Sequence, residues 1–418
     1  MKRRMEHLRA MEHPLHTALC CISVYQPVTS LPPMAHLSSL LSLLEETAPS
    51  PQAVYQAYTG IFYSLSKDGY DTLGAWLFDR LRFSDSPYGE AAGKGLETPA
   101  LRAAAEREID TLARAARLSC QGLKEKMARL LPAPWAGAVS LLPEWPCGVP
   151  FDFQSLTAFY RVNGSGIFAS CRAFVWENQQ LTPVPNPDMP QEEELVGYQM
   201  QRDQVVENTH ALLAGHFVNN VLLYGESGTG KSATVKSLLS VPGFENLRLI
   251  EVQKEQLDTL PRLMRYLNGK KQKFILFLDD LTFETGDTTP SVLKTILEGG
   301  LEPRPVNTAI YATSNRRHLI REFFSERDKG DELDPEETIQ EKTSLTERFG
   351  LRIPYLGLNQ ADFLALVERL AAKERLSITP PVLQKKALQW EMHHPGRTPR
   401  AARQFIASLK MDANGDPK

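Results

Sequence analysis

Two hydrophobic patterns divide the chain. In residues 35–130, apolar side chains recur at helical spacing with polar residues between them, whereas from about residue 191 short apolar runs alternate with helical segments. Examples of the first pattern are Leu37, Leu40, Leu41, Leu44, Leu112, Ala116, Leu123 and Met127. We therefore predict a mainly helical N-terminal domain over 35–190, followed by an α/β core over 191–358.

Five apolar runs in the second half predict the strands of a parallel sheet. Nearly continuous apolar runs are typical of strands that are covered on both faces. The runs are 220–224, 247–252, 274–278, 309–313 and 351–355. After Asn359 only helical patterns follow, and they predict a helical lid over 359–410 with a short tail at 411–418.

Glycine and proline predict turns and boundaries in the first half. Residues 158–162 and 167–176 predict two strands around a glycine-containing turn, which places a β-hairpin near 158–177. The proline-rich stretch 132–150 predicts a packed connector. A second one, Thr182–Pro190, is not expected to hold regular structure and is the predicted domain boundary.

The beginning of the chain carries weak signals. Methionines at positions 5, 11 and 34 are alternative starts, so we expect residues 1–34 to be poorly ordered or to precede the true start. The short apolar stretch after the basic N-terminal residues lacks a small-residue cleavage pattern, which argues against export.

Composition narrows the class of protein. Hydrophobic residues make up 42% and charged residues 23%, as in ordinary globular proteins. The net charge of -3 gives no whole-chain attraction to nucleic acid or anionic lipid, so a nucleic-acid partner is possible only through a local patch. The five cysteines lack metal-ligand spacing and fit a reducing cytoplasm. No apolar run is long enough for a transmembrane helix, so we expect no membrane partner.

The strongest chemical signal is a glycine-rich loop after the first strand of the predicted core. It matches the phosphate-binding pattern G-x-x-x-x-G-K-[ST], in which backbone N–H groups turn inward around phosphates. Its residues are Gly225, Glu226, Ser227, Gly228, Thr229, Gly230, Lys231 and Ser232, with Ala233 next in the following helix. We predict that this loop binds ATP, that Lys231 reaches the β and γ phosphates, and that Ser232 ligates Mg²⁺. A glycine-rich turn with a surface lysine is the alternative.

Two carboxylates end the strand 274–278. We predict that Asp279 holds the hydration shell of Mg²⁺ and that Asp280 acts on the attacking water as a base or positioning group. Many such ATPases carry glutamate at the second position, so the shorter aspartate leaves the hydrolysis rate open. Taken alone, two acids after a strand are a solvated strand end about as often as they are a functional pair.

Three further polar residues are predicted to reach the nucleotide. Asn315 ends the fourth predicted strand and would hydrogen-bond the γ-phosphate or the lytic water; a strand cap is the alternative. Arg348 precedes the last strand and is a candidate arginine finger. Arg400 lies in an arginine cluster that opens the last predicted helix and would reach back to the nucleotide. For both arginines, a role as solvated surface residues is the alternative.

The order of these motifs resembles a known family over about residues 150–410. The segments that carry the resemblance are Leu195-Val-Gly-Tyr-Gln, Gln201-Arg, Asn208-Thr, Asn220-Val-Leu-Leu-Tyr-Gly, the glycine-rich loop, Leu278-Asp-Asp-Leu, Tyr311-Ala-Thr-Ser-Asn-Arg-Arg-His-Leu and Ser344-Leu-Thr-Glu-Arg-Phe-Gly-Leu. Together they resemble the bacterial AAA+ family catalogued as domain of unknown function 815. The resemblance implies a P-loop NTPase of the AAA+ type, with Asn315 as sensor 1, Arg348 as a finger acting on a neighbouring subunit, and Arg400 as sensor 2. In AAA+ proteins the segment before the first strand contacts adenine, which points to Val196 and Gly197.

Two functions remain open from the sequence. The first is an ATPase that works as a homo-oligomer and uses ATP hydrolysis to remodel or move an unknown client. The second is a slow nucleotide-gated binding module or loader, for example for nucleic-acid machinery. The charged segment 322–342 lies where subunits of a ring would meet, although a solvated loop is its alternative. Arg316, Arg317 and His318 would contact phosphate, nucleic acid or the acids of that segment.

Overall fold

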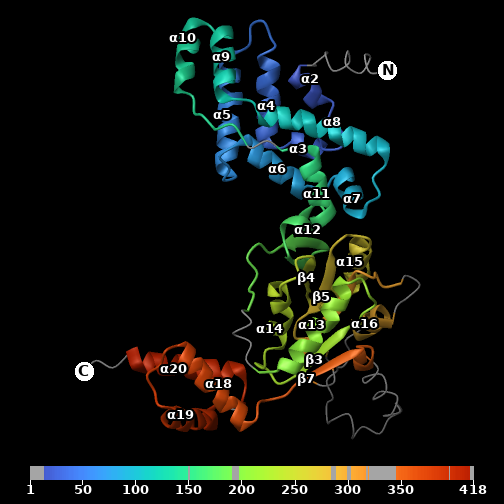
Figure 1. Ribbon diagram of the computed structural model, residues 1–418, viewed down its shortest axis with the longest axis vertical. Helices are drawn as coiled ribbons and strands as arrows, with labels where there is room; N and C mark the ends of the chain where they lie inside the picture. The colour runs from blue at the N-terminus through green and yellow to red at the C-terminus, as the bar shows by residue number, and fades with distance from the viewer. Residues whose placement is uncertain are drawn as a thin grey trace, which may run out of the picture. The chain divides into compact units, whose positions relative to one another are not determined.

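The computed structural model describes most of the chain. The described residues are 14–148, 151–190, 197–283, 289–298, 303–316, 319, 345–394 and 396–414. The chain divides into two compact units, Met1–Ser170 and Cys171–Lys418, both drawn in Figure 1. Among the helices in the described ranges, none has the length and apolar character needed to cross a membrane.

The first unit is helical throughout its described residues, which confirms the helical pattern over 35–130. Its helices are α2 (Leu15–Cys20), α3 (Gln26–Thr29), α4 (Pro32–Leu43), α5 (Pro51–Lys67), α6 (Leu73–Phe83), α7 (Pro87–Lys94), α8 (Pro99–Ala116), α9 (Cys120–Leu130), α10 (Ala133–Ala138), the 3₁₀ helix η1 (Val139–Leu141), α11 (Phe153–Asn163) and α12 (Ile167–Ser170). Several begin where a Ser or Thr side chain accepts an N–H bond from the first turn, as Thr72, Ser86 and Ser119 do. Each such cap stabilises its helix by about 1 kcal/mol.

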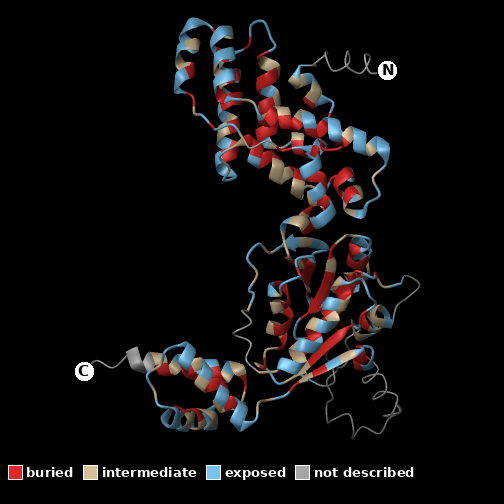
Figure 2. Ribbon diagram, in the orientation of Figure 1, coloured by how far each residue is buried: buried red, intermediate tan, exposed pale blue. Residues whose placement is uncertain are grey.

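The core of the first unit follows from the helical spacing of its apolar residues. The buried faces of the helices point toward one another, and Figure 2 shows them as the red inner surfaces of the ribbon. Fully buried side chains include Leu40, Tyr58, Trp76, Ile109 and Leu112. Burying one such side chain contributes about 1.5–3 kcal/mol, so this core is sufficient to hold a domain of its own.

The expected disorder of residues 1–34 is wrong for the part that is described. Residues 14–34 include α2, α3 and the start of α4, and Leu19, Val28 and Met34 are buried. The carboxylate of Glu108 on α8 holds the turn between α2 and α3, because it accepts hydrogen bonds from three consecutive backbone N–H groups of 23–25. Residues 1–13 lie outside the described residues.

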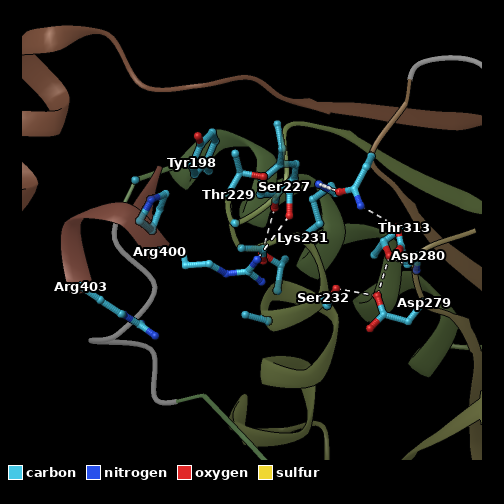
Figure 3. A pocket seen from close by; sticks show the side chains of 18 of the residues that line it. Tyr198, Ser227, Thr229, Lys231, Ser232, Asp279, Asp280, Thr313, Arg400 and Arg403 are labelled. Atoms are coloured by element: carbon cyan, nitrogen blue, oxygen red, sulfur yellow. Dashed lines mark hydrogen bonds between the residues drawn. The ribbon is translucent and has the colours of Figure 1, made fainter. Parts of the chain in front are cut away.

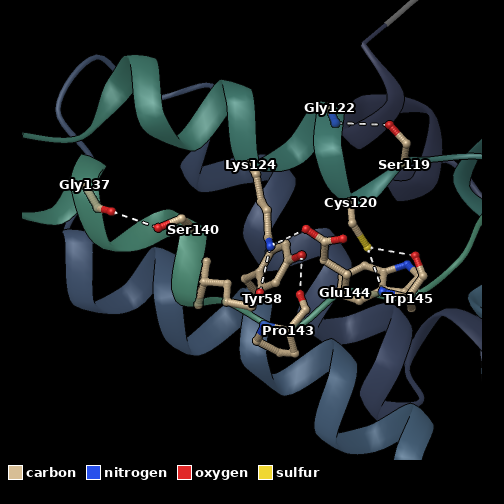
Figure 4. A network of polar contacts seen from close by, with 11 residues as sticks. Tyr58, Ser119, Cys120, Gly122, Lys124, Gly137, Ser140, Pro143, Glu144 and Trp145 are labelled. Carbon is tan, nitrogen blue, oxygen red and sulfur yellow. Dashed lines mark hydrogen bonds and ion pairs between the residues drawn. The ribbon is translucent and has the colours of Figure 1, made fainter.

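The proline-rich connector is packed as predicted, but it also contains the short helices α10 and η1. A network of polar contacts fixes it (Figure 4). Tyr58 Oη donates to the carbonyl of Pro143 at 2.8 Å, and Lys124 Nζ donates to the carbonyl of Leu142 at 2.7 Å. Cys120 Sγ donates to the carbonyl of Trp145 and accepts from its amide, both at 3.1 Å. These contacts satisfy backbone groups of the connector that no regular helix or strand pairs.

The hairpin predicted near 158–177 is wrong in position. Residues 153–163 form α11, because Asp152 and Ser155 make a capping box and the apolar side chains of Phe153, Leu156 and Tyr160 fall on one buried helical face. The observed hairpin joins β1 (Ala173–Glu177) to β2 (Gln180–Pro183). Its two turn residues, Asn178 and Gln179, have φ values of 49° and 58°, as a tight two-residue hairpin turn requires.

The predicted domain boundary at 182–190 is also corrected. β1 pairs in parallel with β4 (Leu247–Val252), so the hairpin belongs to the sheet of the second unit. Thr182 and Pro183, which were expected to lack regular structure, are part of β2. Proline is compatible with this position because β2 is an edge strand. The chain therefore enters the second unit between Ser170 and Cys171.

In the part of the second unit that the structure describes, the strands form one seven-stranded sheet in the order β2-β1-β4-β5-β6-β3-β7. The remaining strands are β3 (Val221–Gly225), β5 (Lys273–Leu278), β6 (Thr308–Ser314) and β7 (Leu351–Tyr355). All pairings are parallel except that of β1 with β2. The five predicted core strands are confirmed to within one residue at each end, because nearly every residue of β4, β5 and β6 is buried.

Some helices of the second unit alternate with the strands, and others come after the last strand, β7. Those of the α/β part are α13 (Gln199–Leu213), α14 (Lys231–Ser237), η3 (Leu238–Ser240), η4 (Lys254–Thr259), α15 (Leu260–Leu267) and α16 (Thr289–Glu298). Three more, α18 (Gln360–Lys373), α19 (Pro380–His393) and α20 (Pro399–Asn414), pack on a small core of their own around Phe363, Leu366 and Phe405. We call these three helices the C-terminal bundle. Because α20 continues to Asn414, the tail predicted to begin at 411 begins too early.

The order of strands in the sheet brings the predicted site residues together. β6 lies between β5 and β3, and all three run parallel. The carboxyl ends of neighbouring parallel strands meet at one edge, which is where ligands bind in open α/β sheets. The loop after β3, the acids after β5 and the residue after β6 therefore meet at that edge.

Candidate functional site

A cavity of about 520 Å³ lies at the carboxyl edge of the sheet (Figure 3). Its size falls within the range of 300–1,000 Å³ that is typical of small-molecule sites. Its lining comes from the start of α13, the loop between β3 and α14, the ends of β5, β6 and β7, and the start of α20. Residues from most of the elements at this edge therefore line the same cavity.

The glycine-rich loop is held in a shape that requires its glycines. Gly225 has a φ of +140°, and a Cβ on it would lie 2.1 Å from the carbonyl oxygen of Tyr355. Gly228 has a φ of +79°, and a Cβ there would lie 2.9 Å from the Cβ of Arg400. Thr229 is buried, and its hydroxyl donates to the Glu226 carbonyl at 2.8 Å. The conformation of the loop therefore requires glycine at both positions.

Lys231 lies between the loop and the end of β6. Its side chain is 6% exposed, and its ammonium donates to the carbonyls of Gly225 at 2.9 Å and Glu226 at 2.7 Å and to Asn315 Oδ1 at 3.0 Å. Burial lowers the pKa of Lys231, while the nearby carboxylates of Asp280 and Asp279 oppose that shift. A partly desolvated ammonium facing a cavity is suited to an anionic ligand.

The two acids after β5 face the loop. Asp279 Oδ1 accepts from Ser232 Oγ at 2.5 Å, which brings together the two residues predicted to hold Mg²⁺. Asp280 Oδ1 accepts from Asn315 Nδ2 at 2.6 Å. Asp280 has a φ of +51°, a left-handed conformation that non-glycine residues seldom adopt and that is often found at functional sites.

This set of oxygens fits magnesium. Mg²⁺ is usually held by one or two carboxylates together with phosphate oxygens and waters, not by a complete protein cage. Ser232 and Asp279 supply such a partial set at the cavity wall. Among the described residues, no group of three or more His, Cys, Asp or Glu side chains is placed to hold a metal ion.

Most of the predicted site residues lie together. Those that line the cavity are Gly197, Ser227, Gly228, Thr229, Gly230, Lys231, Ser232, Ala233, Asp279, Asp280, Asn315 and Arg400. Gly225 and Glu226 lie behind the lining and hold Lys231 through their carbonyls. Val196, Arg317, His318 and the charged segment 322–342 lie outside the described residues.

Arg348 is not brought into the cavity. It lies just before β7, where its guanidinium pairs with Glu298 Oε1 of α16 at 2.7 Å. Its side chain is 44% exposed. Within one chain, therefore, Arg348 does not contact the predicted phosphate-binding residues that are described.

Arg400 joins the C-terminal bundle to the loop. Its backbone N–H donates to the carbonyl of Gly228 at 3.2 Å, and its Nη1 donates to Ser227 Oγ at 3.3 Å. Arg403 and Gln404, one turn further along α20, also line the cavity. Because α20 begins at Pro399, the positive end of its dipole faces the same space.

The sequence interpretation missed an aromatic wall at one end of the cavity. The rings of Tyr198 and Tyr355 stack with centroids 4.9 Å apart. Burial raises the pKa of both tyrosines to about 12, so both remain neutral at physiological pH. Tyr198 follows Gly197 in one of the segments that carried the family resemblance, so a signal was present, whereas β7 offered none for Tyr355.

Other lining residues were also missed, among them Arg202 and Thr313. Arg202 Nη1 donates to the carbonyl of Gly197 at 2.6 Å and so fixes the segment that leads into α13. Thr313 lies inside the buried strand β6, where apolar neighbours gave no reason to single out its hydroxyl. Both stand in segments that carried the family resemblance, so a signal was present, but the contacts of Thr313 with the residues after β5 depend on the pairing of β5 with β6.

The fold and the site together define an α/β protein with a glycine-rich loop that faces two acids across a cavity. The family model described as "Protein of unknown function (DUF815)" matches residues 169–413, more than half of the chain, and the protein belongs to this family. The match begins close to the boundary between the two compact units. No curated protein matches the sequence.

Solved structures with some likeness include RuvB from Thermotoga maritima. The Holliday junction branch migration motor RuvB has a TM-score of 0.38 and 15% identity, and the match covers 55% of this chain and 67% of that one. A point variant of the same protein has a TM-score of 0.39 with the same identity and coverage. Likenesses of this size are too weak to carry a conclusion about function.

Proposed function

We propose that this protein is an AAA+ type ATPase that binds Mg-ATP and hydrolyses it in a homo-oligomer to remodel or move a client. The observation that carries the proposal is the meeting of Lys231, Asp279 and Asp280 around one cavity, with Asn315 bonded to both Lys231 and Asp280. A cation beside two acids, under a loop shaped by glycines, is the arrangement that phosphoryl transfer from a nucleotide requires.

Each residue then has a defined task. The loop 225–232 wraps the phosphates, and Lys231 exchanges its bonds to backbone carbonyls and Asn315 for bonds to phosphate oxygens. Ser232 and Asp279 would hold Mg²⁺, which supplies charge neutralisation on the phosphate oxygens when bound. Asp280 accepts the proton of the attacking water, and Asn315 orients that water.

The aromatic end of the cavity suits the base of the nucleotide. Gly197 and Tyr198 form this end together with Tyr355, and the Tyr198 hydroxyl donates to the carbonyl of Leu356 at 2.5 Å. The stacked rings give an apolar surface against which a base can pack. We assign adenine to this end and the phosphates to the end with Lys231.

The arginine outside the cavity supports action between subunits. Arg348 is half-exposed and can exchange Glu298 for a phosphate on a neighbouring copy. Such an arginine stabilises the charge that develops on the γ-phosphate during transfer. We propose that turnover therefore requires assembly.

The second candidate is a slower nucleotide-gated binding module or loader, for example one that serves nucleic-acid machinery. It is favoured by the bond from Asn315 Nδ2 to Asp280 Oδ1 at 2.6 Å, because this bond occupies a carboxylate oxygen that would otherwise be free to accept from the attacking water. Aspartate is also shorter than glutamate and reaches less far toward water. Steady-state hydrolysis with and without single-stranded DNA separates the two candidates, because a switch binds ATP tightly and turns over very little.

Nucleotide binding is tested with Lys231→Ala. Removing the ammonium is expected to weaken binding of a fluorescent ATP analogue with Mg²⁺ at least about 100-fold, because a charge-assisted bond in a partly buried site is lost. Lys236→Ala, on the same helix but away from the cavity lining, is the matched control and is expected to bind as the wild type does. Equal binding by Lys231→Ala and the wild type contradicts the proposal.

A finger acting between subunits is tested with Arg348→Ala. Binding of the analogue is expected to remain, while turnover falls by about 10³-fold, the lower end of what an arginine finger supplies. Arg352→Ala, an exposed arginine on β7, is the control. Wild-type turnover per subunit should also rise with protein concentration; unchanged turnover in Arg348→Ala would remove this part of the proposal.

A further inference from the structure

The buried side chain of Thr313 lies at the cavity beside the two acids. Thr313 is 1% exposed and lies on β6, one residue beyond the pairing of Leu278 with Ala312. This register places it beside the turn that carries the two acids, as Figure 3 shows. Thr313 also lines the cavity.

Thr313 makes three hydrogen bonds to three consecutive residues. Its hydroxyl donates to Asp279 Oδ1 at 2.6 Å and accepts the backbone N–H of Asp280 at 2.9 Å. Its carbonyl accepts the N–H of Leu281 at 2.7 Å. The direction of the two hydroxyl bonds is fixed, because an amide N–H can only donate and the single hydroxyl proton is left for the carboxylate.

These bonds constrain both acids in different ways. Asp279 Oδ1 accepts from Thr313 and from Ser232, so two donors from different elements hold the plane of the carboxylate. Asp280 is held through its backbone, at the residue whose φ of +51° needs support from its surroundings. One hydroxyl therefore fixes a side chain on one acid and the main chain of the next.

We propose that Thr313 is a positioning residue that sets the orientation of Asp279 for Mg²⁺ and holds Asp280 in its left-handed conformation. The inference rests on the proposed nucleotide site, but it concerns a residue that does not touch the phosphates. Outer residues that orient a metal ligand typically change metal affinity or activity by 10–100-fold when removed.

A purely structural role makes a different prediction. Thr308 lies five residues before Thr313 on the same strand and is also 1% exposed, and its hydroxyl donates to Asn307 Oδ1 at 3.4 Å. A buried threonine that only fills space in β6 would respond to replacement as Thr308 does. Thr308→Val is therefore the matched control for Thr313→Val, which keeps the shape of the side chain and removes the hydroxyl.

The experiment is a Mg²⁺ titration of nucleotide binding by the full chain, followed with a fluorescent ATP analogue. Thr313→Val is expected to need about 10–100-fold more Mg²⁺ for half-maximal enhancement of binding, while its affinity in EDTA equals that of the wild type. Thr313→Ser, which retains the hydroxyl, is expected to restore the Mg²⁺ dependence to within about 3-fold. Thr308→Val is expected to match the wild type.

The outcomes separate this inference from the proposed function. If the wild type binds the analogue and Thr313→Val shows the Mg²⁺ dependence of Thr308→Val, the positioning role is wrong while the nucleotide site stands. If the wild type binds no nucleotide, the proposed function fails and the role of Thr313 fails with it. Thermal unfolding checks the fold of each variant, and if Thr313→Val does not fold, Thr313→Ala carries the same prediction.

Discussion

The two compact units bury charged and polar side chains to different ends. In the first unit, the carboxylate of Glu108 is 8% exposed and accepts bonds from the Ser23 hydroxyl and from the backbone amides of 23–25. In the second unit, Asn315 bonds to both Lys231 and Asp280, Asp279 accepts from two hydroxyls, and all four residues line a cavity of about 520 Å³. The Glu108 carboxylate holds a turn by accepting backbone bonds, whereas the polar groups of the second unit surround a glycine-rich loop.

This comparison shows that burial of an ionisable group is not by itself a sign of function. A buried charge needs partners wherever it lies, because desolvation is costly. What distinguishes the second unit is a positive φ at Asp280, a loop that only glycine can form at Gly225, and a cavity lined by that loop together with a lysine and two adjacent acids. The following changes test that distinction, beginning with the largest expected effect.

Asp280→Asn should separate chemistry from structure in the second unit. Asparagine tolerates the left-handed conformation and keeps the shape of the side chain, but it cannot accept a proton. Turnover is expected to fall by about 10²–10⁴-fold, with affinity for Mg-ATP preserved. Parallel assays of phosphate release and analogue binding check this. A variant that hydrolyses ATP as fast as the wild type would show that Asp280 is another backbone-stabilising carboxylate, as Glu108 is.

Glu108→Ala should lower the stability of the first unit without affecting chemistry in the second. Removing the carboxylate leaves several buried donors without an acceptor, so the first unit is expected to lose about 2–4 kcal/mol of unfolding free energy. Urea unfolding followed by circular dichroism measures the change, and Glu106→Ala, exposed on the same helix, is the control. The affinity for Mg-ATP is expected to stay unchanged. A loss of nucleotide affinity at full folding would break the contrast between the units.

Tyr355→Phe should have the smallest effect. It separates the role of the Tyr355 hydroxyl from that of its stacked ring within the second unit. The hydroxyl of Tyr355 bonds Thr234 Oγ1 at 2.9 Å, away from the stacked face. Its loss is expected to cost about 1 kcal/mol of stability and to change nucleotide affinity by less than about 3-fold. Thermal unfolding and analogue binding measure the two effects. A decrease in affinity of more than tenfold would mean that the hydroxyl itself contacts the ligand.

Local patterns in the sequence were sufficient for the core strands and for the motif residues. Apolar runs located β4, β5 and β6 because a strand buried on both faces has no polar side to interrupt the pattern. The loop at 225–232 was recognisable because its glycines and lysine act over a few neighbouring positions. The division between a helical part and an α/β part was likewise correct, although its boundary was misplaced.

The hairpin shows where local patterns end. The stretch 158–162 has apolar residues that suit a strand or a helix, and the capping box at Asp152 decided for the helix. The true hairpin, 173–183, was recognisable as part of the sheet only through its pairing with β4, some seventy residues further along the chain.

By itself, the sequence determined the five core strands, the helical bundle that follows them, and the identities of Lys231, Ser232, Asp279, Asp280 and Asn315 as candidate site residues. Only the tertiary structure decided that Thr313 bonds both acids, that Tyr198 stacks on Tyr355, and that Arg348 pairs with Glu298. Periodicity along a chain reports which side of an element is buried, whereas the neighbour of each buried group depends on the order of strands in the sheet. That order is set by packing between segments far apart in the sequence.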